Sequence, residues 1–167
     1  RTAIKAALLD LRTMHPCKVK VVRDTGPVDV EFMIHTVFID GTNLALPAIT
    51  QLPVLMQGNS QYTISFPVAV GDEGLALFAE RDISRYLEQG VEGPPNALRR
   101  HSLSDGLFLP TPISQPKQLE VKPGVLLMSN NATQIEITDG AVKITGDLEV
   151  TGKTTIDGDV EATGAID

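Results

Sequence analysis

Apolar and polar residues alternate along the last part of the chain, and glycine interrupts this alternation at a fixed interval. Glycine recurs every six residues from position 140 onward, and Thr or Asp precedes each one. A period of two predicts an extended strand with one apolar face. The apolar residues all occupy even positions: Val142, Ile144, Leu148, Val150, Ile156, Val160, Ala162 and Ile166. The glycines predict bends where only glycine fits comfortably: Gly140, Gly146, Gly152, Gly158 and Gly164.

We expect this repeat, residues 139–167, to lack a partner strand of its own, so that something else must cover its apolar face. Two arrangements fit the glycine period: one chain coiled as a left-handed hexapeptide β-helix, or three identical chains wound together. Five hexapeptides make under two turns of a solenoid, which needs about three or more stacked units. Three-fold closure, in contrast, removes exposed strand edges. We therefore predict a trimeric stalk with the even-numbered residues as its core and the glycines as its bends. A disordered linker would not explain the strict phase of these positions.

Helical spacing marks the start of the chain. Ile4, Ala7, Leu8 and Leu11 recur at the spacing of an amphipathic helix, which the dipeptide His15-Pro16 would end. Residues 1–15 therefore predict a short helical extension that must dock on something, because so short a helix is marginal alone.

Alternation at period two predicts short strands between residues 16 and 112. They fall at 52–56, 62–66, 75–79 and 106–109, with two more within 17–39. Asp82 would cap a short helix that reaches Gln89, and Gly90 would end it. One helix between a third and a fourth strand indicates a small five-stranded barrel, the OB-fold. Further short strands are predicted at 117–121, 124–128 and 134–137.

The sequence thus predicts an all-β chain in four parts. These are an N-terminal helical extension (1–15), an OB-fold domain (16–112), a linker with the first stalk strands (113–138) and the glycine-periodic stalk (139–167). Because the chain stops within a repeat, we expect the tip of the stalk to be missing from it.

The charge is acidic and unevenly divided. The net charge is −7, of which residues 116–167 carry −5 and residues 1–115 carry −2. An acidic stalk argues against nucleic acid as a partner, since phosphate binding needs clustered Lys and Arg. A single cysteine, Cys17, excludes an intrachain disulfide. No apolar run approaches the roughly 20 residues of a membrane span.

The residues do not suggest an enzyme. A hexapeptide-repeat acyltransferase would need a histidine in a long solenoid, but His15, His35 and His101 all lie outside the repeat. His101 and its neighbours Ser102, Ser104 and Asp105 are adjacent in sequence, which is not a nucleophile arrangement. We therefore expect no catalytic, cofactor-binding or metal-binding residue.

Several short motifs, in this order, resemble the OB-fold central baseplate spikes of contractile-tailed phages. They are Leu52-Pro53-Val54, Phe66-Pro67, Gly71-Asp72-Glu73-Gly74, Phe78 with Glu80-Arg81-Asp82, and Arg100-His101 with Ser104-Asp105, Phe108 and Pro110. The resemblance covers residues 17–112, followed by a stalk of the same kind.

The resemblance implies a virion protein of the tail baseplate that works mechanically. It implies a homotrimer whose OB-fold end plugs the baseplate hub and whose triple-stranded β-helix punctures the host outer membrane. Such spikes often carry a tip where His-x-His from three chains binds iron. This sequence has no His-x-His, so any iron would belong to a missing tip. A tailocin or a secretion system could use the same kind of spike.

Overall fold

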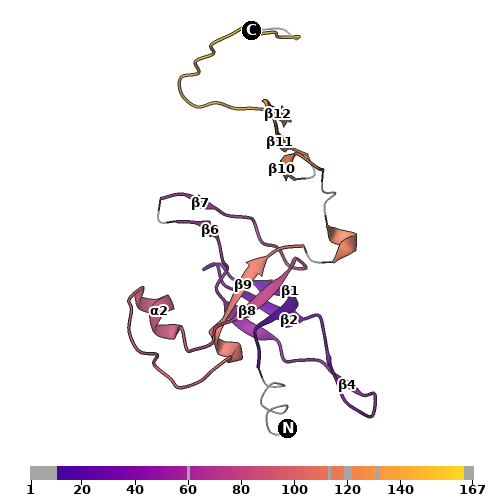
Figure 1. The fold of residues 1–167 in the computed structure, drawn as a ribbon, viewed down its shortest axis with the longest axis vertical. Helices are drawn as coiled ribbons and strands as arrows, with labels where there is room; N and C mark the ends of the chain where they lie inside the picture. Colours follow the sequence, from indigo (N-terminus) through magenta and orange to yellow (C-terminus); the bar gives the residue numbers. More distant parts are fainter. Residues whose placement is uncertain (1–10, 60, 113, 119–121, 131, 164–167) are drawn as a thin grey trace. The chain divides into compact units, whose positions relative to one another are not determined.

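The computed structural model describes residues 11–59, 61–112, 114–118, 122–130 and 132–163. Strands predominate among these residues and helix is scarce, which confirms the predicted β class (Figure 1). The chain divides into two compact units, residues 1–118 and residues 119–167. No helix of the described ranges is long and apolar enough to cross a membrane.

A curled sheet of five antiparallel strands forms the centre of the first unit (Figure 1). Its order is β5-β2-β1-β8-β9. The strands are β1 (Met14–Val22), β2 (Val28–Phe32), β5 (Ile49–Leu52), β8 (Glu73–Phe78) and β9 (Gly106–Pro110).

Backbone hydrogen bonds join the two edges of this sheet. The Phe108 amide on β9 donates to the Pro53 carbonyl at 2.8 Å, and the Leu55 amide donates to the Phe108 carbonyl at 2.7 Å. Val54 and Phe108 form a parallel bridge at the same place. These contacts link β9 to the segment that follows β5, so the curled sheet surrounds one core.

Phe108 is fully buried in that core. The core contains Cys17, Val19, Val28, Val30, Phe32, Ile49, Leu52, Ala76, Phe78 and Phe108. Gly74 on β8 makes room for the Phe108 ring, because a Cβ at residue 74 would lie only 2.3 Å from the ring. Burial raises the pKa of the Cys17 thiol to about 11, and this thiol donates to the Gly74 carbonyl at 3.5 Å.

Two small hairpins and short helices complete the first unit. Strands β3 (Thr36–Val37) and β4 (Asn43–Leu44) form one hairpin, and β6 (Gln57–Gly58) and β7 (Thr63–Ile64) form the other. The helices are α2 (Ser84–Gln89) and two 3-10 turns, η1 (Leu103–Asp105) and η2 (Gln115–Lys117).

Three antiparallel strands form the second unit. They are β10 (Leu126–Ser129), β11 (Gln134–Thr138) and β12 (Ala141–Thr145), in that order across the sheet. The turn between β11 and β12 falls at Asp139-Gly140, where Gly140 has a φ of 95°. The strands at 124–128 and 134–137 were thus correctly predicted apart from their ends.

The expectation that the repeat has no partner strand was wrong for its first hexapeptide. β12 begins directly after Gly140 and pairs with β11 in register along its whole length. Residues 146–163 carry no strand in the single chain. The triple-stranded β-helix requires three chains and stays a prediction.

Two strand predictions in the first unit were displaced. The strand expected at 52–56 lies at Ile49–Leu52 instead. Gln51 has a φ of 61° and Pro53 lacks an amide hydrogen, so a regular ladder cannot continue through this segment. The strand expected at 62–66 shrinks to Thr63–Ile64, because its only partner is the two-residue strand β6.

The predicted helix exists, but its start and its place in the topology differ from expectation. Ile83, rather than Asp82, is the N-cap residue, although the Asp82 carboxylate accepts a hydrogen bond from the amide of Ser84, the first residue of the helix. Gly90 ends the helix in the left-handed conformation, as predicted. The helix lies between the fourth and fifth strands of the sheet, rather than between a third and a fourth.

Most of the predicted N-terminal helix, residues 1–10, lies outside the described residues. Residues 11–13 are not helical, and β1 already begins at Met14 within the predicted extension. The strand expected from Lys117 is wrong at its start, where η2 ends at Lys117, and residues 119–121 are outside the described part.

We predict that Phe108→Ala destabilises the chain by about 3–5 kcal/mol, because it empties the centre of a closed core. The measurement is urea unfolding followed by circular dichroism. Phe38→Ala is the matched control, since Phe38 is 50% exposed, and we expect it to cost under about 1 kcal/mol. Equal effects of the two substitutions would contradict this account of the core.

Candidate assembly site

One face of the β10–β12 sheet is entirely apolar. The strand register places Leu126 opposite Ile137 and Ile137 opposite Val142. Two residues further along, Met128, Ile135 and Ile144 form the next row. Residues two apart on a strand share a face, so all six side chains project from the same side of the sheet.

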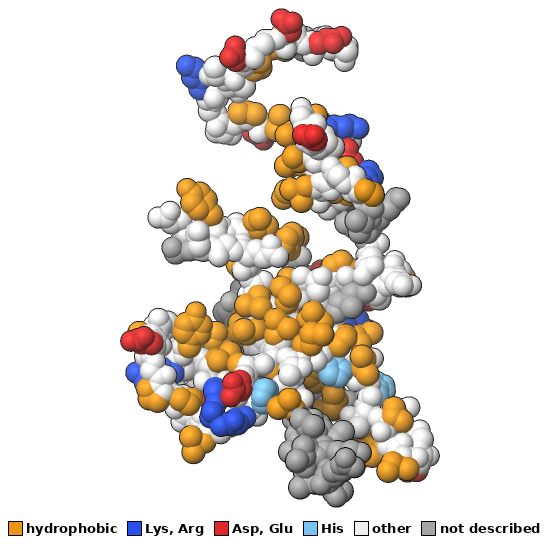
Figure 2. Space-filling view, in the orientation of Figure 1, with side chains coloured by type: hydrophobic (Ala, Val, Ile, Leu, Met, Phe, Trp, Pro, Cys, Tyr) orange, Lys and Arg blue, Asp and Glu red, His pale blue; other side chains and the backbone are white. Residues whose placement is uncertain are grey.

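This apolar face is exposed in the single chain. The exposed fraction is 60% for Leu126, 63% for Val142 and 40% for Ile144, and Met128 and Ile137 are exposed as well. Figure 2 shows hydrophobic side chains gathered on the surface of this sheet. A contiguous apolar surface of this kind marks a site of interaction, and a small sheet needs such a face covered to be stable.

The opposite face of the same sheet is mostly polar. Glu136 lies between Leu127 and Lys143 in the register, and its carboxylate accepts a hydrogen bond from Lys122 Nζ at 2.9 Å. That hydrogen bond lowers the pKa of Glu136. The sheet thus has one face suited to water and one face suited to a partner.

The predicted stalk residues fall into two groups. Val142 and Ile144 lie on β12, within the apolar face. The others that the structure describes follow β12 and are all exposed: Leu148, Val150, Ile156, Val160 and Ala162. Gly140, Gly146, Gly152 and Gly158 all have positive φ, between 95° and 141°. Gly164 and Ile166 lie outside the described residues. The roles of these residues in a stalk stay predictions.

Leu126, Met128, Ile135 and Ile137 were not predicted as part of this site. Their alternation indicated strands, and Ile135 and Ile137 occupy odd positions. The Asp139-Gly140 turn reverses the chain, so odd residues before it face the same side as even residues after it. A hairpin at that turn identifies Ile135 and Ile137, whereas Leu126 and Met128 are placed by the separate pairing of β10 with β11.

Glu73 holds the segment that leaves the first sheet. Its carboxylate accepts from the Ser114 amide at 3.0 Å and from the Ser114 hydroxyl at 2.9 Å, and Lys117 Nζ lies 3.3 Å away. These contacts, with the Ser114 amide first, lower the pKa of Glu73 to about 2. Residues 114–117 are therefore fixed to β8 rather than left as a free linker.

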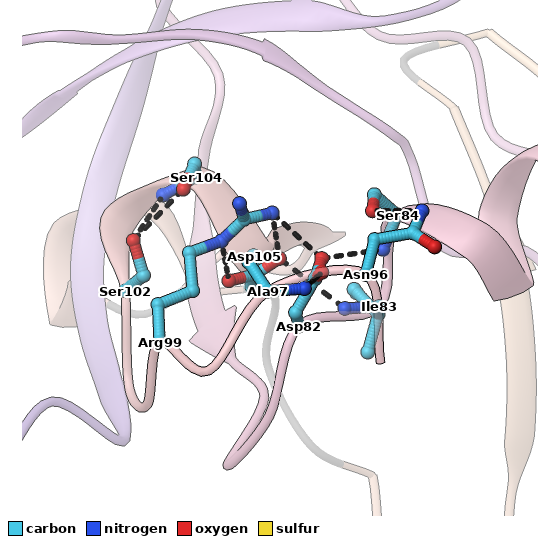
Figure 3. Close-up of polar contacts among 9 residues, drawn as sticks. All are labelled: Asp82, Ile83, Ser84, Asn96, Ala97, Arg99, Ser102, Ser104 and Asp105. Atoms are coloured by element: carbon cyan, nitrogen blue, oxygen red, sulfur yellow. Dashed lines mark hydrogen bonds and ion pairs between the residues drawn. The ribbon is translucent and has the colours of Figure 1, made fainter. Parts of the chain in front are cut away.

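Arg99 binds two buried carboxylates at the end of the helical segment (Figure 3). Its Nε donates to Asp105 Oδ2 and its Nη2 to Asp82 Oδ1, both at 2.6 Å. Asp82 also accepts from the backbone amides of Ser84 and Ala97. The Ser84 amide is the main cause that lowers the pKa of Asp82 to about 2. Nothing in the sequence pattern indicated this cluster.

The histidines do not converge on a site. His15 packs edge-on against Phe32, His35 lies near Asn43, and His101 Nδ1 is 2.8 Å from the Arg12 carbonyl. Within the described ranges, no group of three or more His, Cys, Asp or Glu side chains could hold a metal ion.

We predict that Glu73 stabilises the chain only where it is ionised. Because its folded pKa lies below the ordinary value of 4.5, its contribution is full above that pH and is lost as the pH falls towards about 2. In urea unfolding across a pH series, the gap between wild type and Glu73→Gln should shrink over that window. Glu88→Gln, which removes an exposed carboxylate, is the control. A gap that stays constant with pH would contradict the assignment.

We further predict that Arg99→Ala lowers the unfolding midpoint strongly, because it leaves Asp82 and Asp105 buried without a counter-ion. Arg99→Lys should recover only part of the loss, since an ammonium group cannot reproduce the guanidinium fork. Arg100→Ala is the control: Arg100 is exposed, and its nearest contact to Glu80 is 3.9 Å. Thermal unfolding should rank wild type and Arg100→Ala together, then Arg99→Lys, then Arg99→Ala. The cluster would have no structural role if all four melted together.

Comparison with known proteins identifies the first unit. The sequence model of one family, described as the phage protein Gp138 N-terminal domain, matches residues 16–111. A search of curated proteins gave no match. The matched region contains the curled sheet apart from the first two residues of β1, and it covers more than half of the chain. The chain therefore belongs to the Gp138 N-terminal domain family of phage proteins.

Proposed function

We propose that this chain is the central spike of a contractile phage tail. Three copies associate through the apolar face of β10–β12 and continue as a triple-stranded stalk over residues 139–167. The spike plugs the hub of the baseplate at one end and punctures the host outer membrane at the other. Its work is mechanical, and we propose no catalysed reaction.

The exposed apolar face of the β10–β12 sheet is the observation that carries this proposal. Its edge strand β12 lies in the first hexapeptide of the glycine repeat, and the same alternation of apolar residues continues into residues 146–163. A cover for the sheet would therefore extend naturally along the repeat. Three identical chains supply such a cover to one another and leave no free strand edge.

The first unit supports the same proposal. Its five strands, joined at their edges by the bridge between Val54 and Phe108, fit the partly open barrel of an OB-fold. A match to a phage protein family over these residues supports a structural role in a virion. We assign this barrel to the end that binds the baseplate hub, because the acidic repeat carries the net charge of −5 at the other end.

A tailocin or a secretion system could use a spike of the same build. The family match to a phage protein favours the phage tail. No nucleic acid partner is proposed, because the chain carries 21 acidic residues against 14 basic ones and has an excess of acid in the repeat.

We predict that light scattering gives about three times the chain mass of 17.9 kDa. Ile144→Asp should break the trimer, because it places three carboxylates in the apolar interface. Thr145→Asp is the matched control, since Thr145 is the next residue and faces the polar side.

Each outcome has a clear meaning. A wild-type monomer would overturn the trimeric spike. A trimer that survives Ile144→Asp as well as it survives Thr145→Asp would mean that the copies associate elsewhere.

A further inference from the structure

The longest stretch without charge in this chain lies in the first unit, away from the repeat. Residues 41–71 contain no Asp, Glu, Lys, Arg or His. Elsewhere in the first unit, charged residues recur at short intervals. This stretch includes the β6–β7 hairpin, which we call the arm and define as residues 56–66, of which Ser60 lies outside the described residues.

The arm is exposed throughout its described length, yet it carries large apolar side chains. The exposed fraction is 61% for Met56, 75% for Tyr62, 49% for Ile64 and 54% for Phe66. A charge-free apolar hairpin with free edges is a liability for a protein that stays alone in water. No other strand of the described chain pairs with β6 or β7.

Hydrogen bonds join the described residues on either side of Ser60. Asn59 Oδ1 accepts from the amides of Gln61 and Tyr62, each at 2.9 Å. The Asn59 amide donates to the Tyr62 carbonyl at 2.7 Å. A shallow depression that is largely open to solvent borders the arm between Gln57 and Ile64. The arm thus offers a formed surface with room for side chains of a partner.

We propose that the arm packs against the same arm of neighbouring copies around the three-fold axis. On the three-fold axis itself identical residues meet, so a charge placed there faces its own copies and is repelled. A contact with a different protein has no such constraint and can use opposite charges. A stretch of 31 residues without charge therefore fits a contact between identical chains best.

The β3–β4 hairpin of the same unit differs from the arm in carrying a charge. β3 and β4 also expose apolar side chains, with Val37 at 70% and Ile39 at 109%. Next to Ile39, however, stands Asp40, whose carboxylate accepts from the Thr42 hydroxyl at 2.6 Å and the Thr42 amide at 2.9 Å. Three such carboxylates would repel one another at an axis, so this hairpin is excluded from the contact.

This inference rests on the proposed trimer, and the test separates the two. Tyr62→Cys and Ile39→Cys are prepared in the full chain, where the native Cys17 is buried and serves as the background. The molar mass of each variant is first measured by light scattering, and the variant is then treated with a short bismaleimide. We expect Tyr62→Cys to give cross-linked dimers in most molecules on a denaturing gel, and Ile39→Cys to remain at the wild-type background.

A monomer by light scattering would overturn the proposed function and this inference with it. A trimer in which the thiol of Tyr62→Cys is modified but not cross-linked would overturn this inference alone and leave the arm to a different protein. Equal cross-linking at both positions would likewise overturn it, because the contact would not be specific to the arm.

A second pair of variants tests the charge argument directly. Ile64→Asp and Ile64→Asn have nearly the same shape, but only Asp brings like charges together. We expect Ile64→Asp to weaken association by about tenfold or more relative to Ile64→Asn, with the difference reduced at high salt. Equal association of the two variants would contradict a symmetric contact at this residue.

Discussion

Apolar strands must be covered on every face that water would otherwise meet, and the two units of this chain meet that requirement differently. In the first unit the sheet curls, and the hydrogen bonds of Phe108 with Pro53 and Leu55 join its edges. Ten apolar side chains are buried as a result. In the second unit, the described residues form one sheet of three strands. Its apolar face is exposed in the single chain, and the proposed trimer would cover it.

The buried charges that the structure describes in the first unit are all paired. In the first unit the buried carboxylates are bound: Asp82 and Asp105 by Arg99, and Asp29 by Arg23 at 2.6 Å. Among the described residues, no buried polar side-chain atom lacks a hydrogen-bond partner. Such groups hold loops to the sheet but offer nothing to a partner. The candidate assembly face of β10–β12, in contrast, is apolar and exposed.

Local patterns predicted the elements better than their partners. Alternation and the Asp139-Gly140 turn were enough to place β11 and β12, because both signals lie within a few residues. The pairing of β12 with β11 was not predicted, because the six-residue repeat indicated a ribbon that pairs with identical chains. The strand expected at 52–56 failed because the positive φ of Gln51 is a tertiary outcome that composition does not reveal. The Arg99 cluster joins residues that are distant in sequence, and only the fold brings them together.

In the glycine repeat, charged and large apolar residues are strictly separated. Every charged residue from Asp139 onward occupies an odd position, whereas the large apolar residues occupy even ones. In an extended ribbon these two sets face opposite sides. If three ribbons share an axis, the apolar sides face inward and each charge points to solvent, away from its copies. A ribbon bound to an unrelated surface would not need every charge excluded from one side. The strict separation is therefore what the proposed arrangement of three identical chains around one axis requires.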